Sequence, residues 1–144
     1  VLRFEFKLEA GGNNGLAIRS PLEGISAYTG MEIQILDDQH ESYHNDKFEL
    51  APYQYHGSIY GVVPAKQGSL KPIGEWNCEE VVADGSRIKI TVNGQVVVDV
   101  DLRAIKPPYI DGHEHPGLHN EKGYLGFLGH GARIEFRNIR VKEL

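Results

Sequence analysis

The stretch EWNCEEVVADGSRIKITVNGQVVVDVDL (residues 75–102) decides the fold. It contains three apolar runs, and two tight-turn dipeptides, Asp84-Gly85 and Asn93-Gly94, separate them. Asp-Gly and Asn-Gly between apolar runs are the strongest short-range signals of a β-hairpin, because these residues tolerate the positive φ angles of two-residue turns. The stretch therefore predicts a three-strand antiparallel meander with strands at 75–82, 87–92 and 95–102.

The alternation of apolar and polar side chains extends beyond the meander in both directions. Residues 1–9 alternate strictly between apolar and charged side chains, and this period of two is typical of a half-buried strand. In 133–141 the apolar phase slips between Phe136 and Ile139, which predicts a bulge near Asn138. Further strands are predicted at 16–20, 31–37, 58–63 and 123–129.

No segment of about ten residues carries apolar side chains at helical spacing, so the chain is expected to be all-β. Roughly eight or nine short strands joined by tight turns indicate a two-sheet sandwich or a barrel. Two long segments, 38–57 and 103–122, interrupt the strands. Loops of this length in compact domains are usually either functional or disordered.

The composition bounds the class of protein. The 144 residues suit one domain, which buries roughly two-thirds of the surface that its unfolded chain exposes. The net charge is -5 and the basic residues are scattered, which argues against a nucleic-acid partner. Cys78 is the only cysteine, so an internal disulfide is excluded and a buried, apolar role is favoured. No apolar run approaches the roughly 20 residues of a membrane-spanning helix.

Three polar residues, Arg19, Glu32 and Gln34, stand between apolar neighbours on predicted strands. Their side chains should project from the sheet face opposite the core. Either they simply face water, as outer sheet faces ordinarily do, or they form a binding surface. Together with Tyr60 and Trp76 they offer planar hydrogen-bonding groups and aromatic faces, which suit a hydroxyl-rich ring.

The strand at 123–129 leads into the sequence GHG, in which His130 stands between two glycines. A histidine at a strand end is aimed by a rigid sheet and can exchange protons near neutrality. The alternative is a turn histidine that bonds a backbone carbonyl. Gly126 and Gly129 indicate either close approach of a ligand to this strand or relief of crowding between the sheets.

A second histidine cluster, HEHPGLH (113–119), combines imidazoles with the carboxyl of Glu114. Such donors suit Zn²⁺ or another divalent metal, and His113 and His115 are the candidate ligands. The spacing matches no zinc motif, so a loop open to solvent is favoured over a metal site. No nucleophile elbow, Cys–His pair or phosphate loop is present, so acyl and phosphoryl transfer have no support.

Six segments, in their order along the chain, resemble the 3-keto-disaccharide hydrolase domain family of sugar-degrading bacteria. They are NNGLAIRS (13–20), MEIQILD (31–37), GSIYGVV (57–63), KPIGEWN (71–77), ITVNGQVVVD (90–99) and GFLGHGARIEFRNIRV (126–141). The resemblance implies one antiparallel jelly-roll sandwich over residues 1–144, similar to concanavalin and laminin-G domains. It also implies that N-terminal strands of the family are missing from this chain, and that the protein is secreted to the periplasm or the exterior.

The resemblance further implies a glycoside hydrolase or lyase for sugars with a ketone at carbon 3, bound on the concave sheet. The catalytic candidates that it marks are His130, Glu32, Arg19 and Glu75. Such a reaction needs a base, a stabiliser of the enolate oxygen and an acid for the leaving group. We assign the base to His130 or Glu32, and the sugar-binding candidates are Gln34, Tyr60, Trp76 and Asn77.

Arg19 is the expected stabiliser of the enolate and Glu75 the expected acid, and a divalent metal in the loop 113–119 is an alternative to Arg19. In a direct two-carboxylate hydrolysis, Glu32 and Glu75 would instead flank the scissile bond at roughly 5–10 Å. Leu128 stands where many family members have a glutamine, so this position is not expected to contact the sugar. The competing functions are a non-catalytic carbohydrate-binding module and an adhesion domain that binds protein.

Overall fold

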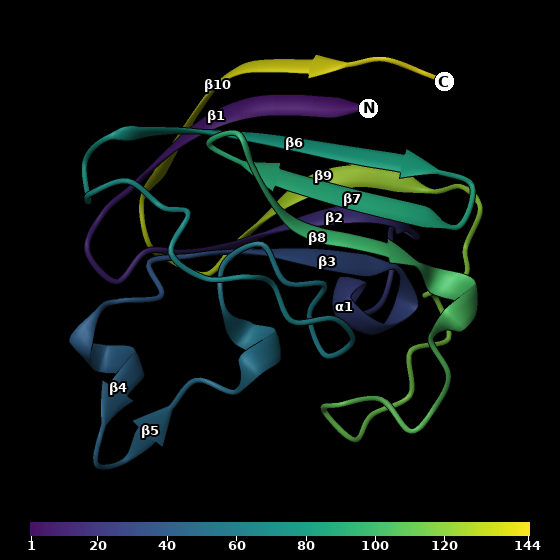
Figure 1. Ribbon diagram of the computed structural model, residues 1–144, viewed down its shortest axis with the longest axis horizontal. Coiled ribbons are helices and arrows are strands. Elements are labelled where there is room, and N and C mark those ends of the chain that lie inside the picture. The colour runs from purple at the N-terminus through teal and green to yellow at the C-terminus, as the bar shows by residue number, and fades with distance from the viewer.

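The computed structural model describes residues 1–144 and contains two antiparallel sheets that pack against each other (Figure 1). One sheet has five strands in the order β10-β1-β6-β7-β8, and the other has three in the order β3-β2-β9. Their bounds are β1 Leu2–Leu8, β2 Asn13–Ser20, β3 Met31–Leu36, β6 Trp76–Asp84, β7 Arg87–Val92, β8 Gln95–Asp101, β9 Tyr124–Gly129 and β10 Ile134–Val141. The predicted all-β, two-sheet sandwich is confirmed.

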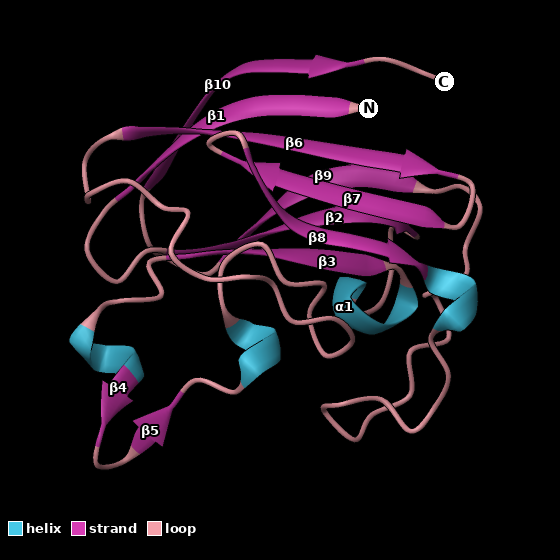
Figure 2. Ribbon diagram, viewed as in Figure 1, coloured by secondary structure: helices cyan, strands magenta, loops and turns pink.

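The connections carry the short elements (Figure 2). These are the helix α1 (Ser26–Thr29), the small hairpin of β4 (His44–Asn45) and β5 (Phe48–Glu49), and the 3-10 helices η1 (Glu41–Tyr43), η2 (Pro52–Gln54) and η3 (Leu102–Ala104). Each is too short to leave a period in the sequence, which is why none was predicted. No helix has the length and apolar character needed to cross a membrane.

The meander forms as predicted, with an adjustment at its first turn. Asn93 (φ 48°) and Gly94 (φ 82°) close the β7–β8 hairpin in the left-handed conformation that an Asn-Gly turn supplies. The β6–β7 turn consists of Gly85 and Ser86 rather than Asp84 and Gly85, because Asp84 still pairs with its partner in β7. β6 is therefore longer than the sequence indicated.

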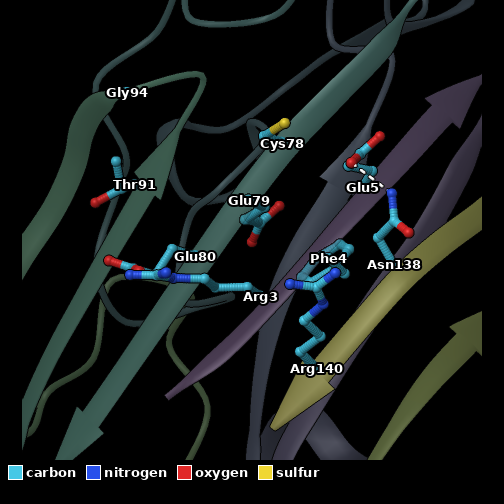
Figure 3. A pocket seen from close by; sticks show the side chains of 10 residues that line it. All are labelled: Arg3, Phe4, Glu5, Cys78, Glu79, Glu80, Thr91, Gly94, Asn138 and Arg140. Carbon is cyan, nitrogen blue, oxygen red and sulfur yellow. Dashed lines mark hydrogen bonds and ion pairs between the residues drawn. The ribbon is translucent and has the colours of Figure 1, made fainter. Parts of the chain in front are cut away.

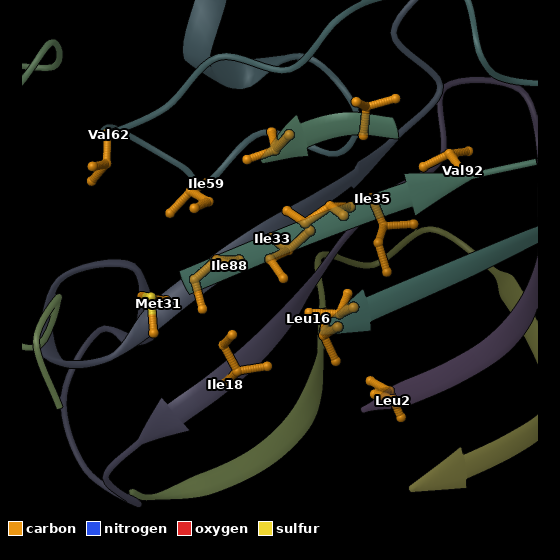
Figure 4. Packing of buried hydrophobic residues seen from close by; sticks show 14 of the residues in the cluster. Leu2, Leu16, Ile18, Met31, Ile33, Ile35, Ile59, Val62, Ile88 and Val92 are labelled. Atoms are coloured by element: carbon orange, nitrogen blue, oxygen red, sulfur yellow. The ribbon is translucent and has the colours of Figure 1, made fainter. Parts of the chain in front are cut away.

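The core lies between the two sheets and contains 19 buried apolar side chains (Figure 4). Phe6 of β1, Leu16 of β2, Ile33 of β3 and Ile90 of β7 have no exposed surface. Each such side chain contributes about 1.5–3 kcal/mol by its burial. Because the core fixes these residues inward, it also fixes which side chains of β2 and β3 face outward, where the candidate site lies.

The bulge predicted near Asn138 and the two C-terminal strands, β9 and β10, are present in the structure. Asn138 has φ 53°, and the pairing of β1 with β10 shifts register between Arg3 and Glu5, so the predicted bulge near Asn138 is confirmed. β9 and β10 belong to different sheets, and Phe127 stacks on Phe136 between them with ring centroids 3.9 Å apart. This aromatic contact ties the two sheets together at their β9 and β10 edges.

Three local predictions are wrong. Residues 58–63 form a loop with two isolated bridges rather than a strand, because the chain turns back on itself at Gly61, whose φ is 75°. β2 begins at Asn13 and not at Leu16. Cys78 is exposed rather than buried, because it alternates along β6 with the buried side chains of Asn77 and Glu79.

Candidate functional site

The outer face of the three-stranded sheet is covered rather than open. Glu32, Gln34 and Leu36 alternate outward along β3, yet none is more than 8% exposed. α1 and the long connection between β3 and β6 supply the covering side chains, among them Tyr28 and Tyr60, and a pocket of about 340 Å³ remains beneath them. The water-facing alternative for Glu32 and Gln34 therefore does not hold.

Small residues of β2 lie beside the outward-facing side chains of β3 that line this pocket. Gly15 pairs with Gln34 of β3, and Ala17 pairs with Glu32. A Cβ atom on Gly15 would overlap the carboxyl group of Glu32, so that carboxyl lies across Gly15 and not away from the sheet. On the neighbouring strand, a Cβ on Gly126 would meet no atom within 4 Å. Gly15 thus has a defined task, which is to let Glu32 lie flat over the sheet.

The Glu32 carboxyl is poised for proton transfer. Burial raises the pKa of Glu32 from 4.5 to about 7, and no hydrogen bond or neighbouring charge opposes this shift. A carboxyl whose pKa is near neutrality can serve as a base or an acid in catalysis. Strongly shifted pKa values in a cleft are typical of functional sites, although structural groups also show them.

Other polar groups that line the same pocket have hydrogen-bonding capacity that the protein does not use. Asn13 lies beside Leu36 in the ladder, and its Oδ1 atom is buried and forms no hydrogen bond. Tyr60 accepts a hydrogen bond from Gln54 Nε2 at 3.3 Å, which leaves its own hydroxyl proton available. Burial, followed by the negative charge of Asp111, raises the pKa of Tyr28, which keeps this phenol protonated. Buried polar atoms are normally satisfied, so these groups indicate a polar ligand.

The pocket brings together four of the residues that the sequence marked: Glu32, Gln34, Tyr60 and His130. Arg19 is not among them, and its expected grouping with Glu32 and His130 is corrected. Arg19 has φ 50° in a bulge of β2, where the pairing with β9 shifts register between Ala17 and Ser20. It lines a separate depression with His119 and Glu121. The bulge interrupts the alternation from which its direction was inferred.

The expected places of Glu75, Trp76 and Asn77 in the site are also corrected, because β6 belongs to the five-stranded sheet. Asn77 is buried, and its Oδ1 atom accepts hydrogen bonds from the backbone of Lys71 and from Asn93. The ring of Trp76 is covered by the guanidinium of Arg137 at 3.8 Å. Glu75 is exposed in the turn before β6. The two-carboxylate arrangement of Glu32 with Glu75 therefore has no common pocket.

The histidines of the loop 113–119 differ from each other. The side chain of His113 is 65% exposed, as a solvated loop predicts, whereas that of His115 is 1% exposed. His115 donates from Nδ1 to the carbonyl oxygen of Ala27 at 2.9 Å, and its Nε2 lies 3.1 Å from Asp111. No group of three His, Cys, Asp or Glu side chains is arranged to hold a metal ion. The metal candidates His113 and His115 thus lack a donor set.

The geometry can be compared with known proteins. The family model described as 3-keto-alpha-glucoside-1,2-lyase-like domain matches residues 1–142. The chain belongs to this family. The 3-keto-disaccharide hydrolase of Bacteroides thetaiotaomicron is 26% identical to the chain over an alignment of 170 residues. The alignment covers 99% of the chain and 58% of that relative. The chain thus spans a little over half of the relative's length.

Solved structures share the fold of this chain. A "putative glycosyl hydrolase" from Parabacteroides distasonis has a TM-score of 0.79 and 29% identity, over 99% of this chain and 77% of its own. A second protein of the same description and organism has a TM-score of 0.74 and 21% identity, over 96% of this chain and 66% of its own. At that lower identity the likeness establishes the sandwich alone.

Several residues of this pocket were not predicted from the sequence. Tyr43 and Gln54 come from the long connection 38–57, whose length and polar character were the available signal. Asn13 precedes the strand that the sequence predicts at 16–20, so its side chain was not assigned a direction. Tyr28 lay in a segment with no strand or helix pattern, so nothing in the sequence marked it.

A second depression, with a volume of about 380 Å³, lies over the outer face of the five-stranded sheet (Figure 3). Three of its five charged side chains have partners: Arg3 pairs with Glu80, and Glu5 accepts a hydrogen bond from Asn138 at 2.7 Å. Charges that are already satisfied have less need of a ligand. The pocket over the three-stranded sheet is therefore the better candidate site.

Proposed function

We propose that this pocket cleaves glycosides whose sugar ring carries a ketone at carbon 3, with Glu32 as the general base. The observation that carries the proposal is the Glu32 carboxyl, which lies buried across Gly15 with a pKa of about 7. Membership of the 3-keto-alpha-glucoside-1,2-lyase-like family supports the class of substrate. A carboxyl in this state is half ionised at neutral pH, so it can both take and return a proton.

The proposed reaction follows from the ketone. A carbonyl at carbon 3 acidifies the hydrogen on carbon 2, and Glu32 takes that proton while the electron pair moves to the ketone oxygen as an enolate. The electrons then return, the double bond between carbons 1 and 2 forms, and the aglycone oxygen leaves carbon 1 with a proton. Water added across the double bond places a hydroxyl on carbon 1 and a hydrogen on carbon 2. A lyase stops before this addition, and a hydrolase completes it.

The other pocket residues fit the remaining tasks. The enolate oxygen needs preorganised hydrogen-bond donors, and the phenols of Tyr28 and Tyr60 and the amide of Gln34 supply them in place of Arg19. The leaving oxygen needs a proton, and we assign its donation to His130, which lines the same pocket. Glu32 and Gln34 are two residues apart on β3, a separation of about 7 Å, so both side chains can reach one sugar ring.

The test follows both the substrate and the hydrogen on carbon 2. The domain is incubated with a 3-keto-glucoside and, as control, with the same glucoside lacking the ketone, and release of the aglycone is measured. We expect turnover of the ketone only. In deuterium oxide, a hydrated product should carry solvent deuterium on carbon 2 at a level above that of an enzyme-free control, whereas an eliminated product should carry no hydrogen on carbon 2. Equal turnover of both glucosides, or product with unexchanged carbon 2, would contradict the elimination mechanism.

The second candidate is a carbohydrate-binding module with no turnover. The tyrosines Tyr28, Tyr43 and Tyr60 around the pocket favour it, because aromatic faces pack against sugar rings. Titration calorimetry with the 3-keto-glucoside separates the two functions when it is run beside the turnover assay. Saturable binding without release of the aglycone would replace the enzyme by the binding module.

A further inference from the structure

The segment 109–120, which contains the HEHPGLH cluster, packs against the residues around α1. Gly117 donates a backbone hydrogen bond to the carbonyl of Tyr28 at 2.8 Å, and Asn120 Nδ2 donates to the carbonyl of Thr29 at 2.9 Å. A Cβ on Gly117 would overlap the backbone of Thr29, so the two segments are in close contact. This segment therefore holds one wall of the candidate site from behind.

A buried pair of side chains completes this hold. The side chains of Asp111 and His115 are 2% and 1% exposed. His115 Nδ1 donates to the carbonyl of Ala27 at 2.9 Å, and His115 Nε2 lies 3.1 Å from Asp111 Oδ2. Asp111 is itself fixed, because the backbone N–H of His113 donates to its Oδ1 at 3.0 Å.

The pair also contacts Tyr28 and the backbone next to Tyr60. The ring of Tyr28 meets the ring of His115 edge to face, with centroids 5.1 Å apart. On the other side, a Cβ on Gly61 would overlap Asp111 and His115, so the pair packs directly on the residue that follows Tyr60. The ring of Tyr28 and the residue that follows Tyr60 thus pack against one buried pair.

α1 cannot hold Tyr28 by itself. It has four residues, and its N-cap residue, Ile25, provides no side-chain hydrogen bond. A helix this short has no stability of its own, because one turn costs more conformational entropy than its few hydrogen bonds return. The position of Tyr28 therefore depends on what packs against α1.

We propose that Asp111 and His115 are positioning residues that hold α1, and with it the phenol of Tyr28, against the pocket. The consequence for turnover rests on the function proposed above, whereas the hold on α1 does not. The HEHPGLH cluster, which the sequence presented as a metal candidate, contributes its buried histidine to this hold and leaves His113 on the surface.

Substitutions of His115 separate the two contacts of its ring. Asparagine places an amide N–H near the position of Nδ1 and keeps the bond to Ala27, whereas glutamine reaches toward Asp111 and loses that bond. Hydrogen exchange is measured at the amides of residues 28–30, which bond within this turn. We expect His115→Gln to accelerate this exchange about tenfold, as loss of one hydrogen bond does, and His115→Asn to restore most of the protection.

Two controls keep the result specific. His119→Ala alters an exposed histidine of the same cluster, which lines the separate depression beside Arg19, and should leave the exchange of 28–30 unchanged. The amides of β6 and β7 report on the whole sandwich and should also be unaffected. Unchanged exchange at 28–30 in His115→Gln, or equal acceleration in β6 and β7, would overturn the proposal. If His115→Gln does not fold, hydrogen exchange at residues 28–30 is compared between Asp111→Asn and the parent instead.

Turnover provides the second arm. His115→Gln should lower kcat/KM for the 3-keto-glucoside about tenfold, and by less than about twofold when Tyr28 is already alanine, because the pair acts through Tyr28. Additive losses would overturn the link to Tyr28. If the unaltered domain does not turn over the sugar, the proposed function fails, and the exchange experiment still decides whether the pair holds α1.

Discussion

The outer faces of the two sheets begin from the same sequence pattern and end in opposite states. On the five-stranded sheet, charged side chains pair across strands, as Lys7 does with Glu135 at 2.8 Å and Arg87 with Asp99 at 2.8 Å. On the three-stranded sheet, Glu32 and Asn13 Oδ1 are buried and have no partner. Polar residues that satisfy one another belong to a solvated surface. Polar residues that line a pocket and are left unsatisfied indicate a place kept for a ligand.

The two states also differ in energy. An exposed ion pair contributes about 0–1 kcal/mol, because water screens it and the side chains lose freedom. Burying Glu32 shifts its pKa from 4.5 to about 7, which corresponds to roughly 3 kcal/mol against its ionised form. A fold keeps such a cost most readily where the group serves a function. The comparison therefore predicts that equivalent substitutions on the two faces have unequal effects.

The largest effect is expected for Glu32→Gln, with Glu80→Gln on the five-stranded sheet as its matched control. Removing the base should lower release of the aglycone by about 10²–10⁴-fold, while the control should retain activity within about twofold. Both variants are assayed with the 3-keto-glucoside, and their folding is checked by urea unfolding. Similar activities in the two variants would remove the distinction between the faces.

The next effect is expected for Gly15→Ala, with Gly126→Ala as control. A methyl group on Gly15 overlaps the Glu32 carboxyl and must displace it, whereas a methyl group on Gly126 meets no atom within 4 Å. We expect at least about a tenfold loss of kcat/KM in the first variant, because small displacements of a catalytic group are costly. The free energy of unfolding of the Gly126→Ala variant should lie within about 0.5 kcal/mol of that of the parent. A Gly15→Ala domain of full activity would show that Glu32 need not lie across the sheet.

The same contrast explains what the sequence could predict. Alternation and turn dipeptides act over a few residues, so β1, the meander and the bulge at Asn138 were predictable from local patterns. The direction of Glu32 and Gln34 away from the core was predictable for the same reason. Their burial was not, because the covering tyrosines come from segments with no periodic pattern.

Errors arose where a local pattern was interrupted or where sheet membership decided the outcome. Arg19 was placed by an alternation that a bulge breaks. Trp76 was grouped with Glu32 by its residue type and Asn77 by the family resemblance, yet β6 lies in the other sheet. Which strands pair is set by the whole fold, and no short stretch of sequence contains that information.

The five-stranded sheet also contains a buried carboxyl without a hydrogen-bond partner, and this one lies in the core rather than in a pocket. Glu79 of β6 points into the core, where neither of its oxygens has a hydrogen-bond partner and His56 Nε2 lies 3.5 Å away. Burial raises the pKa of Glu79 from 4.5 to about 8 and lowers that of His56. Both groups are therefore neutral in the folded protein at neutral pH.

The linkage of Glu79 to stability has a definite sign. Because its pKa is higher in the folded than in the unfolded chain, its contribution is fully present below about pH 4.5 and is lost as the pH rises through about 8. Glu79→Gln should flatten the decline in the free energy of unfolding over this range by a few kcal/mol. Urea unfolding at pH 5 and pH 9 measures it. If the free energy of unfolding falls equally in the variant and the parent between pH 5 and pH 9, the pH dependence belongs to Glu32 and other groups.

The smallest effect is expected at the surface of the five-stranded sheet. Arg137 covers the ring of Trp76 at 3.8 Å and pairs with Glu5 at 2.6 Å, but its side chain is 49% exposed. Arg137→Ala should lower the free energy of unfolding by about 0.5–1 kcal/mol, because exposed cation–π contacts and ion pairs are weak. Turnover of the 3-keto-glucoside should not change. A loss of turnover comparable to that of Gly15→Ala would place function on both faces, since only a ligand bound at Trp76 gives this exposed arginine such an effect.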